Sequence, residues 1–150
     1  MTTTTTTRYL APDRFTANVF NPLMAFLARH GISVMGSRQL AVRGRTSGEW
    51  RTTPVNPMEL DGHRYLVAPR GETQWVRNMR VAGGGELHLG RKVEPIAVTE
   101  LPDDVKAPIL REYVRRWKWE VGQFFDGIDA TSTDADLLAI APGFPVFEIR

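Results

Sequence analysis

Apolar and polar positions in the middle of the chain alternate over short stretches, with the spacing of strands. Residues 39–43 and 50–58 are rich in apolar and β-branched side chains, and the turn-forming residues 44–48 separate them. Asp61-Gly62 is typical of a type I′ hairpin turn, in which both central residues need positive φ, and it joins residues 55–60 to residues 64–68. These patterns predict a series of strands joined by tight turns.

Later segments add strands of similar length. Residues 86–89 and 93–101 flank a turn at Gly90-Arg91, and residues 144–149 have the composition of a closing strand. Pro95 places the strand 93–101 at an edge or at a bulge, because proline has no N–H to donate to a neighbouring strand. The chain is therefore predicted to form about six strands.

Helical spacing is limited to short segments. Asn21-Pro22 is a typical helix start and predicts a helix over residues 22–30, and residues 75–81 have the spacing of a two-turn helix that ends at the glycines 83–85. Pro102 opens another helix with apolar residues four apart, and residues 134–141 form a short one. Helices at the ends and in a late insertion predict a mainly β, α+β fold, an antiparallel β-barrel with covering helices.

Length and composition indicate one domain. The 150 residues are 42% hydrophobic, which is enough for a continuous core. A threonine run at residues 2–7 predicts a disordered tail over residues 1–8, so residues 9–150 are expected to form the single domain. The sequence has no cysteine, which excludes disulfides and thiolate metal sites. No apolar stretch approaches the roughly 20 residues of a membrane span, so we expect a soluble, cytoplasmic protein without an integral membrane segment.

Positive charge is concentrated in the predicted strands. The net charge is only +2, but the segment 38–92 holds ten basic and five acidic side chains. A local excess in a nearly neutral chain favours a compact anionic ligand and a small-molecule substrate over nucleic acid, which requires a broad basic face. Charge alone is equally consistent with arginines scattered over solvated strand faces.

Several common site motifs are excluded by their context. The glycines 83–85 follow a helix and precede a strand, the reverse of the dinucleotide-binding order, and residues 44–48 lack the Gly-Lys-Ser/Thr ending of a phosphate-binding loop. His30, His63 and His88 have no metal-ligand spacing, so no metal site is expected. There is no Gly-x-Ser-x-Gly elbow for a serine hydrolase.

One segment concentrates groups that bind anions. Residues 44–55 contain two arginines, three threonines, one serine and two glycines. Guanidinium forks match phosphate or carboxylate geometry, and hydroxyls and glycine N–H groups add donors. The segment indicates an anion site in a loop between two strands, with a polar barrel turn as the structural alternative.

The order and spacing of six segments resemble the deazaflavin-dependent nitroreductase family of F420H2-dependent oxidoreductases. The likeness covers residues 38–101 well and extends to the closing strand. The six segments are Arg45-Thr46-Ser47-Gly48, Arg51-Thr52-Thr53-Pro54, Asp61-Gly62, Tyr65-Leu66-Val67-Ala68, Trp75-Val76-Arg77-Asn78-Met79 and Phe144-Pro145-Val146.

The resemblance implies a split β-barrel, like those that bind FMN, holding coenzyme F420. This cofactor is an 8-hydroxy-5-deazaflavin with a phosphate and a glutamate tail. The implied function is hydride transfer from reduced F420 to a small organic acceptor such as a quinone, a nitroaromatic compound or an activated alkene. Alternatives are a non-catalytic protein of the same fold that binds F420, a fatty acid or a haem-like ligand, and an FMN-dependent oxidoreductase. A homodimer is plausible because split barrels often pair.

The resemblance also implies a role for individual residues. The phosphate and tail are expected at Arg45, Ser47, Gly48, Arg51, Thr52, Thr53 and Pro54. The deazaflavin ring is expected to be held largely by backbone groups of Val67, Ala68, Pro69, Arg70 and Gly71, and Trp75 and Asn78 cover the phosphate end. Many relatives have Lys or Arg where this chain has Thr46, a difference that Arg43, Arg70 or Arg77 is placed to offset.

The substrate side of the pocket is less defined. Tyr113, Trp117 and Phe124 are the candidates, because the corresponding late helix of the family lies near the ring, although core packing is the commoner role for such aromatics. No acid–base residue is required, since the cofactor supplies the hydride. A water molecule, Tyr65 or Tyr113 is the expected proton donor.

Overall fold

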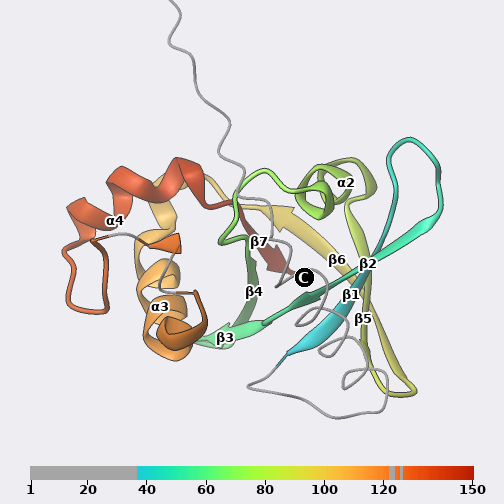
Figure 1. Ribbon diagram of the computed structural model, residues 1–150, viewed down its shortest axis with the longest axis horizontal. Coiled ribbons are helices and arrows are strands. Elements are labelled where there is room, and N and C mark those ends of the chain that lie inside the picture. Colours follow the sequence, from blue (N-terminus) through green and yellow to red (C-terminus); the bar gives the residue numbers. More distant parts are fainter. Residues whose placement is uncertain (1–36, 122–123, 126) are drawn as a thin grey trace, which may run out of the picture.

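The computed structural model describes residues 37–121, 124, 125 and 127–150, which form one curled sheet with covering helices (Figure 1). The predicted tail and the predicted helix 22–30 lie outside these residues. The described strands are β1 (Arg38–Arg43), β2 (Trp50–Val55), β3 (Met58–Leu60), β4 (His63–Val67), β5 (Gly84–Leu89), β6 (Lys92–Glu100) and β7 (Val146–Ile149). The helices are α2 (Gln74–Ala82), α3 (Ala107–Val121) and α4 (Asp134–Ile140), with short 3₁₀ turns η2 (Asp103–Val105) and η4 (Ala141–Gly143).

The strand order explains why the sheet curls. All pairs are antiparallel and the order is β2-β1-β5-β6-β7-β4-β3, so β2 and β3 lie at opposite edges. Only Asn56 and Pro57 separate these two strands in sequence, a link that spans at most about 10 Å. The sheet must therefore bend until its edges meet, which confirms the split barrel. The single strand predicted over residues 50–58 is divided at this link.

Strands β4 and β7 separate two hydrophobic cores. Successive residues of a strand point to opposite faces, and on β4 Leu66 belongs to one core whereas Val67 belongs to the other. Phe147 and Val146 divide in the same way on β7. One core fills the barrel with Leu40, Met79 and their neighbours, and the other lies under α3 and α4, which sit together beside β3 and β4 in Figure 1.

The predicted turn and the predicted edge position are confirmed. Asp61 and Gly62 both have positive φ, 53° and 81°, as a type I′ turn requires. Pro95 pairs with Glu86 of β5 on one side. On the other side of β6, β7 pairs only with Val98 to Glu100, so no described strand lies beside Pro95 there. The missing N–H of the proline therefore breaks no hydrogen bond between described strands.

The three glycines 83–85, predicted to end the helix, divide between the helix end and β5. Only Gly83 ends α2, with φ of 72°, whereas Gly84 and Gly85 already belong to the strand. A Cβ atom on Gly84 or Gly85 would lie 2.3 Å from the carbonyl oxygen of Ile96 or Ala41, respectively. The neighbouring strands therefore approach too closely for any side chain, and the strand predicted from residue 86 begins two residues earlier.

The later helices follow the predicted pattern with one offset. Asp103–Val105 forms a separate 3₁₀ turn, and α3 begins at Ala107, so that Pro108 falls in its first turn, where proline is tolerated. Thr133 caps α4 with a reciprocal bond pair to Asp136. Within the described part of the chain, no helix has the length and apolarity needed to cross a membrane.

Candidate functional site

The β1–β2 turn projects beyond the sheet beside α2 (Figure 1). The Gly44 N–H donates to the Glu49 carbonyl at 2.8 Å, and the Gly48 N–H donates to the Gly44 carbonyl at 2.9 Å. Gly48 has a positive φ of 74°, and the Ser47 hydroxyl accepts from the Glu49 N–H at 3.1 Å. These contacts fix the turn that carries Arg45 and leave its side chains outside the sheet.

Arg45 is held by α2, where its partner Asn78 lies 33 residues later in the sequence. Its backbone N–H and its Nη1 both donate to Oδ1 of Asn78, at 3.0 and 2.8 Å. Nη1 also donates to Oε1 of Gln74 at 3.0 Å. Gln74 and Asn78 are four residues apart and share one face of the helix. Asn78 is 4% exposed, so this amide is a fixed anchor for the arginine.

The partners of Arg45 leave its charge uncompensated. Both acceptors are neutral amide oxygens, and no carboxylate of the described residues forms an ion pair with it. Nearby, Arg43 stacks over the Trp50 ring, with Cζ 4.2 Å from the centroid, and donates to the Gly48 carbonyl. Arg51 lies 3.7 Å from Glu49, but this pair is largely exposed and weak. The turn thus carries positive charge, which fits a phosphate-bearing group.

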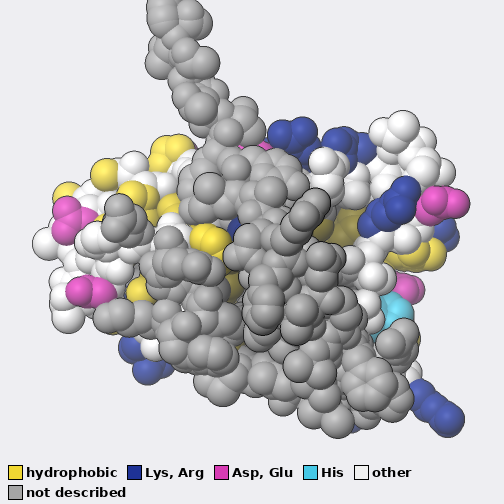
Figure 2. All heavy atoms as spheres, in the orientation of Figure 1, with side chains coloured by type: hydrophobic (Ala, Val, Ile, Leu, Met, Phe, Trp, Pro, Cys, Tyr) yellow, Lys and Arg dark blue, Asp and Glu magenta, His cyan; other side chains and the backbone are white. Residues whose placement is uncertain are grey.

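Figure 2 shows Lys and Arg side chains gathered over α2 and the adjoining turn. The predicted residues of β2 do not all face this region, however. Arg51 pairs with Val42, and Thr53 pairs with Leu40. Paired residues point to the same face of a sheet, and Val42 and Leu40 belong to the barrel core. The side chains of Arg51 and Thr53 therefore lie on the face of the sheet that is directed to the barrel core. Thr52 pairs with Ala41, and the pleat directs its side chain to the opposite face. The structure therefore separates the Thr52 side chain from those of Arg51 and Thr53.

The loop after β4 is tied to the protein by its own backbone. The Ala68 N–H donates to the Pro145 carbonyl at 2.9 Å, and the Gly71 N–H donates to the Ala68 carbonyl at 3.2 Å. The N–H groups of Ala68 and Gly71 are therefore bonded within the protein, and the role of this backbone at a bound ring stays a prediction. Gly71 is buried with φ of 83°, a conformation that favours glycine.

The structure brings two predicted ring-side residues together. The guanidinium of Arg70 lies over the Phe124 ring, with Cζ 4.6 Å from the centroid. Tyr113 and Trp117, by contrast, are only 3% and 5% exposed and belong to the core under α3 and α4. Their rings lie 5.0 Å apart, so both take part in core packing, and their role at a substrate stays a prediction.

Tyr65 has the properties of a group that retains its proton. It is half-buried on β4, opposite Met58 of β3 and Glu148 of β7. Burial, with smaller contributions from the carboxylates of Glu148 and Asp61, raises the pKa of its hydroxyl. The phenol is therefore neutral throughout the ordinary pH range.

Two residues at the start of α2 were missed by the sequence analysis, which began this helix at residue 75. Gln74 contacts Arg45, as described above. Thr73 occupies the N-cap position, and its buried Oγ1 has no hydrogen-bond partner among the described residues. Buried hydroxyls are normally satisfied, so this orphan fits a ligand oxygen. A threonine just before a helical repeat is the N-cap signal that identifies it. Trp75 follows, with its ring 5.7 Å from that of Phe147.

Comparisons with known proteins place the chain among cofactor-dependent reductases. A family model described as F420H(2)-dependent quinone reductase matches residues 23–129. No curated protein matches the chain in sequence.

Solved structures share its fold at low sequence identity. A structure described as an F420-H2 dependent reductase (FDR-A) has a TM-score of 0.51 and 19% identity, over 77% of this chain and 94% of that one. A chain described as a domain-swapped dimer has a TM-score of 0.56 and 17% identity, over 90% and 98% of the two chains. A protein of unknown function from Agrobacterium tumefaciens has a TM-score of 0.55 and 17% identity, over 94% and 57%.

Proposed function

Because the chain belongs to the F420H(2)-dependent quinone reductase family, we propose that it transfers hydride from reduced coenzyme F420 to an acceptor of the quinone class. It is an oxidoreductase, and its cofactor is coenzyme F420. Nitroaromatic compounds and activated alkenes are the other acceptor classes to be compared.

The amide-held guanidinium of Arg45 is the observation that carries the proposal. A carboxylate partner would satisfy this cation, whereas the oxygens of Asn78 and Gln74 fix its position and leave its charge for a ligand. Arginine forks bind phosphate in a bidentate way. We therefore assign Arg45 to the phosphate of F420, with Arg51 and the Thr73 hydroxyl beside it.

We extend the proposed site to the other cofactor contacts that the family resemblance implies. In this proposal the turn and β2 hold the phosphate and tail, the loop 69–73 lines the ring, and α2 connects the two ends. Besides Arg45, Arg51 and Thr73, the set comprises Ser47, Gly48, Thr52 through its backbone, Thr53, Pro54, Val67, Ala68, Pro69, Arg70, Gly71, Gln74, Trp75 and Asn78.

The bound cofactor supplies the hydride, and the residues of the chain orient it and move a proton. Arg70 and Phe124 line the side on which the acceptor enters. Tyr65 lies on β4, two residues before its end, and its hydroxyl is protonated at neutral pH, so it is the first candidate to deliver the proton that follows hydride transfer. Tyr113 is the second candidate, although its ring is packed between Trp117 and Phe125.

Titration of the purified protein with F420 and with FMN tests the cofactor. We expect F420 to bind more tightly, and preferential binding of FMN would contradict the proposal. Oxidation of reduced F420, followed by absorbance, tests the reaction with a quinone, a nitroaromatic compound and an activated alkene. Turnover should be fastest with the quinone. Tight binding of F420 without turnover of any acceptor would indicate a carrier instead of an enzyme.

We propose further that the protein is a homodimer, an assembly supported by the structural neighbour described as a domain-swapped dimer. Light scattering after size exclusion should give twice the chain mass of 16.9 kDa. A single species at the chain mass would contradict it.

A further inference from the structure

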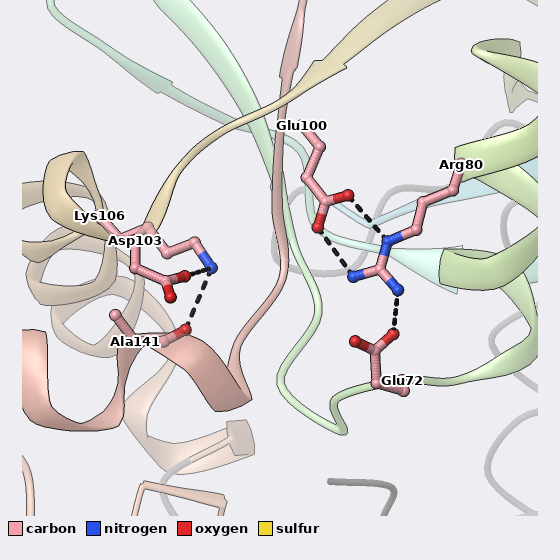
Figure 3. Close-up of polar contacts among 6 residues, drawn as sticks. All are labelled: Glu72, Arg80, Glu100, Asp103, Lys106 and Ala141. Carbon is pink, nitrogen blue, oxygen red and sulfur yellow. Dashed lines mark hydrogen bonds and ion pairs between the residues drawn. The ribbon is translucent and has the colours of Figure 1, made fainter. Parts of the chain in front are cut away.

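Arg80, in the last turn of α2, holds two carboxylates at once (Figure 3). Its Nε and Nη2 donate to the two carboxylate oxygens of Glu100 at 2.8 Å each, and its Nη1 donates to Oε2 of Glu72. Glu100 is the last residue of β6, and Glu72 lies in the loop between β4 and α2. One guanidinium therefore joins a helix, a strand end and the loop 69–73.

Side chains help to anchor this loop to other elements. Its backbone makes short-range bonds, from the Gly71 N–H to the Ala68 carbonyl and from the Thr73 N–H to the Gly71 carbonyl, which shape the loop. Longer-range anchors come from Arg70, which contacts Phe124, and from Glu72, which contacts Arg80. These two side-chain contacts tie the loop to Phe124, beyond the end of α3, and to α2.

We propose that Arg80 is a positioning residue for the cofactor loop: by holding Glu72 against Glu100, it fixes the loop 69–73 in the conformation that binds coenzyme F420. Arg70 and Thr73, which flank Glu72, are placed by the same contact. The inference rests on the proposed function, because it gives this loop its role at the ring.

Electrostatics makes Arg80 more important than the number of its hydrogen bonds suggests. The three groups carry two negative charges and one positive charge, so removal of the guanidinium leaves two carboxylates that repel each other. The loop 69–73 carries one of them, so we expect this repulsion to shift the loop. The hydrogen bonds to Glu100 and Glu72 raise the pKa of Arg80 above its ordinary value, and the clamp therefore stays charged at any physiological pH.

Arg64 provides a matched control. It donates two hydrogen bonds to the Glu94 carboxylate and links β4 to β6, and its side chain is 37% exposed, the same fraction as that of Arg80. Glu94 lies outside the loop 69–73. Arg80→Met and Arg64→Met each remove the charge and keep the apolar stem of the side chain, so a general loss of surface ion pairing affects both variants equally.

Hydrogen–deuterium exchange of the cofactor-free protein tests the clamp without reference to F420. We expect amide exchange in peptides that cover residues 69–73 to become at least about tenfold faster in Arg80→Met and in Glu72→Ala, and to be unchanged in Arg64→Met. Glu72→Ala removes no buried group and decides the question if Arg80→Met does not fold. Unchanged exchange in this loop for Glu72→Ala would overturn the proposal.

Cofactor titration and kinetics then test the consequence. Wild-type binding of F420 decides the proposed function, and the ratio of variant to wild type decides the clamp. We expect the Kd and the KM for reduced F420 to rise about tenfold in Arg80→Met and less in Glu72→Ala, with a smaller change in kcat. An unchanged Kd in both variants, in a protein whose wild type binds F420, would overturn the positioning role and leave the proposed function intact.

Discussion

Arg45 and Arg80 are arginines with opposite chemical surroundings on the two sides of one helix. Arg45 donates to Asn78 and Gln74 of α2, both of them neutral amides, while Arg80 projects from α2 to the carboxylates of Glu72 and Glu100. Both side chains are held by residues distant in sequence. The difference lies in charge: two carboxylates neutralise Arg80, whereas no carboxylate among the described residues pairs with Arg45.

In the proposed function, arginine serves the fold at Arg80 and ligand binding at Arg45. A guanidinium held by carboxylates contributes its charge to the fold, and an additional anion gains little from it. A guanidinium held by amide oxygens loses its conformational freedom before the ligand arrives and retains its charge. The charge of the groups that an arginine binds therefore identifies ligand-binding arginines better than the exposure of the side chain does. Arginines held by amides and arginines held by carboxylates both lie near the surface.

The largest expected effect comes from removal of the amide-held arginine. Arg45→Ala should raise the Kd for F420 about ten- to hundredfold, because it deletes charge-assisted contacts to the phosphate. Fluorescence titration measures the Kd, and Arg64→Ala is the control that should stay near wild type. A change of less than about twofold for Arg45→Ala would show that the phosphate lies elsewhere.

The difference between the two arginines is tested most directly by giving Arg45 a carboxylate partner like those of Arg80. Asn78→Asp keeps the shape of the anchor and turns the amide-held Arg45 into a carboxylate-held one. We expect F420 affinity to fall about three- to tenfold while the melting temperature stays the same or rises. Titration and thermal unfolding on the same sample separate the two effects. Wild-type affinity in this variant would mean that the charge of Arg45 does not matter.

The buried hydroxyl of Thr73 provides a further test of the proposed ligand contacts. Thr73→Val removes a buried hydroxyl that makes no hydrogen bond to any residue that the structure describes. The free energy of unfolding without cofactor should therefore stay constant or rise by up to about 1 kcal/mol, while F420 affinity falls about two- to tenfold. Denaturant unfolding and titration provide the two readouts. A less stable variant with unchanged affinity would assign the hydroxyl to the fold.

The smallest effect concerns another carboxylate held by arginines. Hydrogen bonds from Arg115 and then Arg116, against an opposing effect of burial, lower the pKa of Glu112 from 4.5 to about 2. A depressed folded-state pKa gives stability that is complete above about pH 4.5 and is lost as the pH falls toward 2. Glu112→Gln should therefore show a flatter decline of the free energy of unfolding between pH 4.5 and 3, by at most about 1 kcal/mol. Identical slopes for variant and wild type would contradict this ion-pair network.

Local rules made much of the fold predictable. The hairpin at Asp61-Gly62 and the end of α2 at Gly83 follow from positive φ, which the nearest residues alone dictate. The break between β2 and β3 was missed because it depends on sheet closure, which no local pattern contains. The place of Gly84 and Gly85 in β5 was missed for the same reason, since the carbonyls that exclude a Cβ belong to β6 and β1.

For the candidate site, the sequence predicted only those residues that the family resemblance pointed to. It indicated Arg45 and Asn78, which the structure brings into contact across 33 residues. It grouped Thr52 with Arg51 and Thr53, although the strand period alone separates their side chains. The clamp at Arg80 was missed, because its acceptors lie 8 and 20 residues away in different elements. Such juxtapositions are properties of tertiary structure.

One measurement tests the central claim, that the uncompensated charge of Arg45 binds the phosphate of the cofactor. The Kd values of wild type and Arg45→Ala are measured for F420 and for the same deazaflavin without its phosphate and glutamate tail. We expect the substitution to weaken F420 at least about tenfold more than the truncated ligand. An equal loss for both ligands, or no loss for either, would contradict the account.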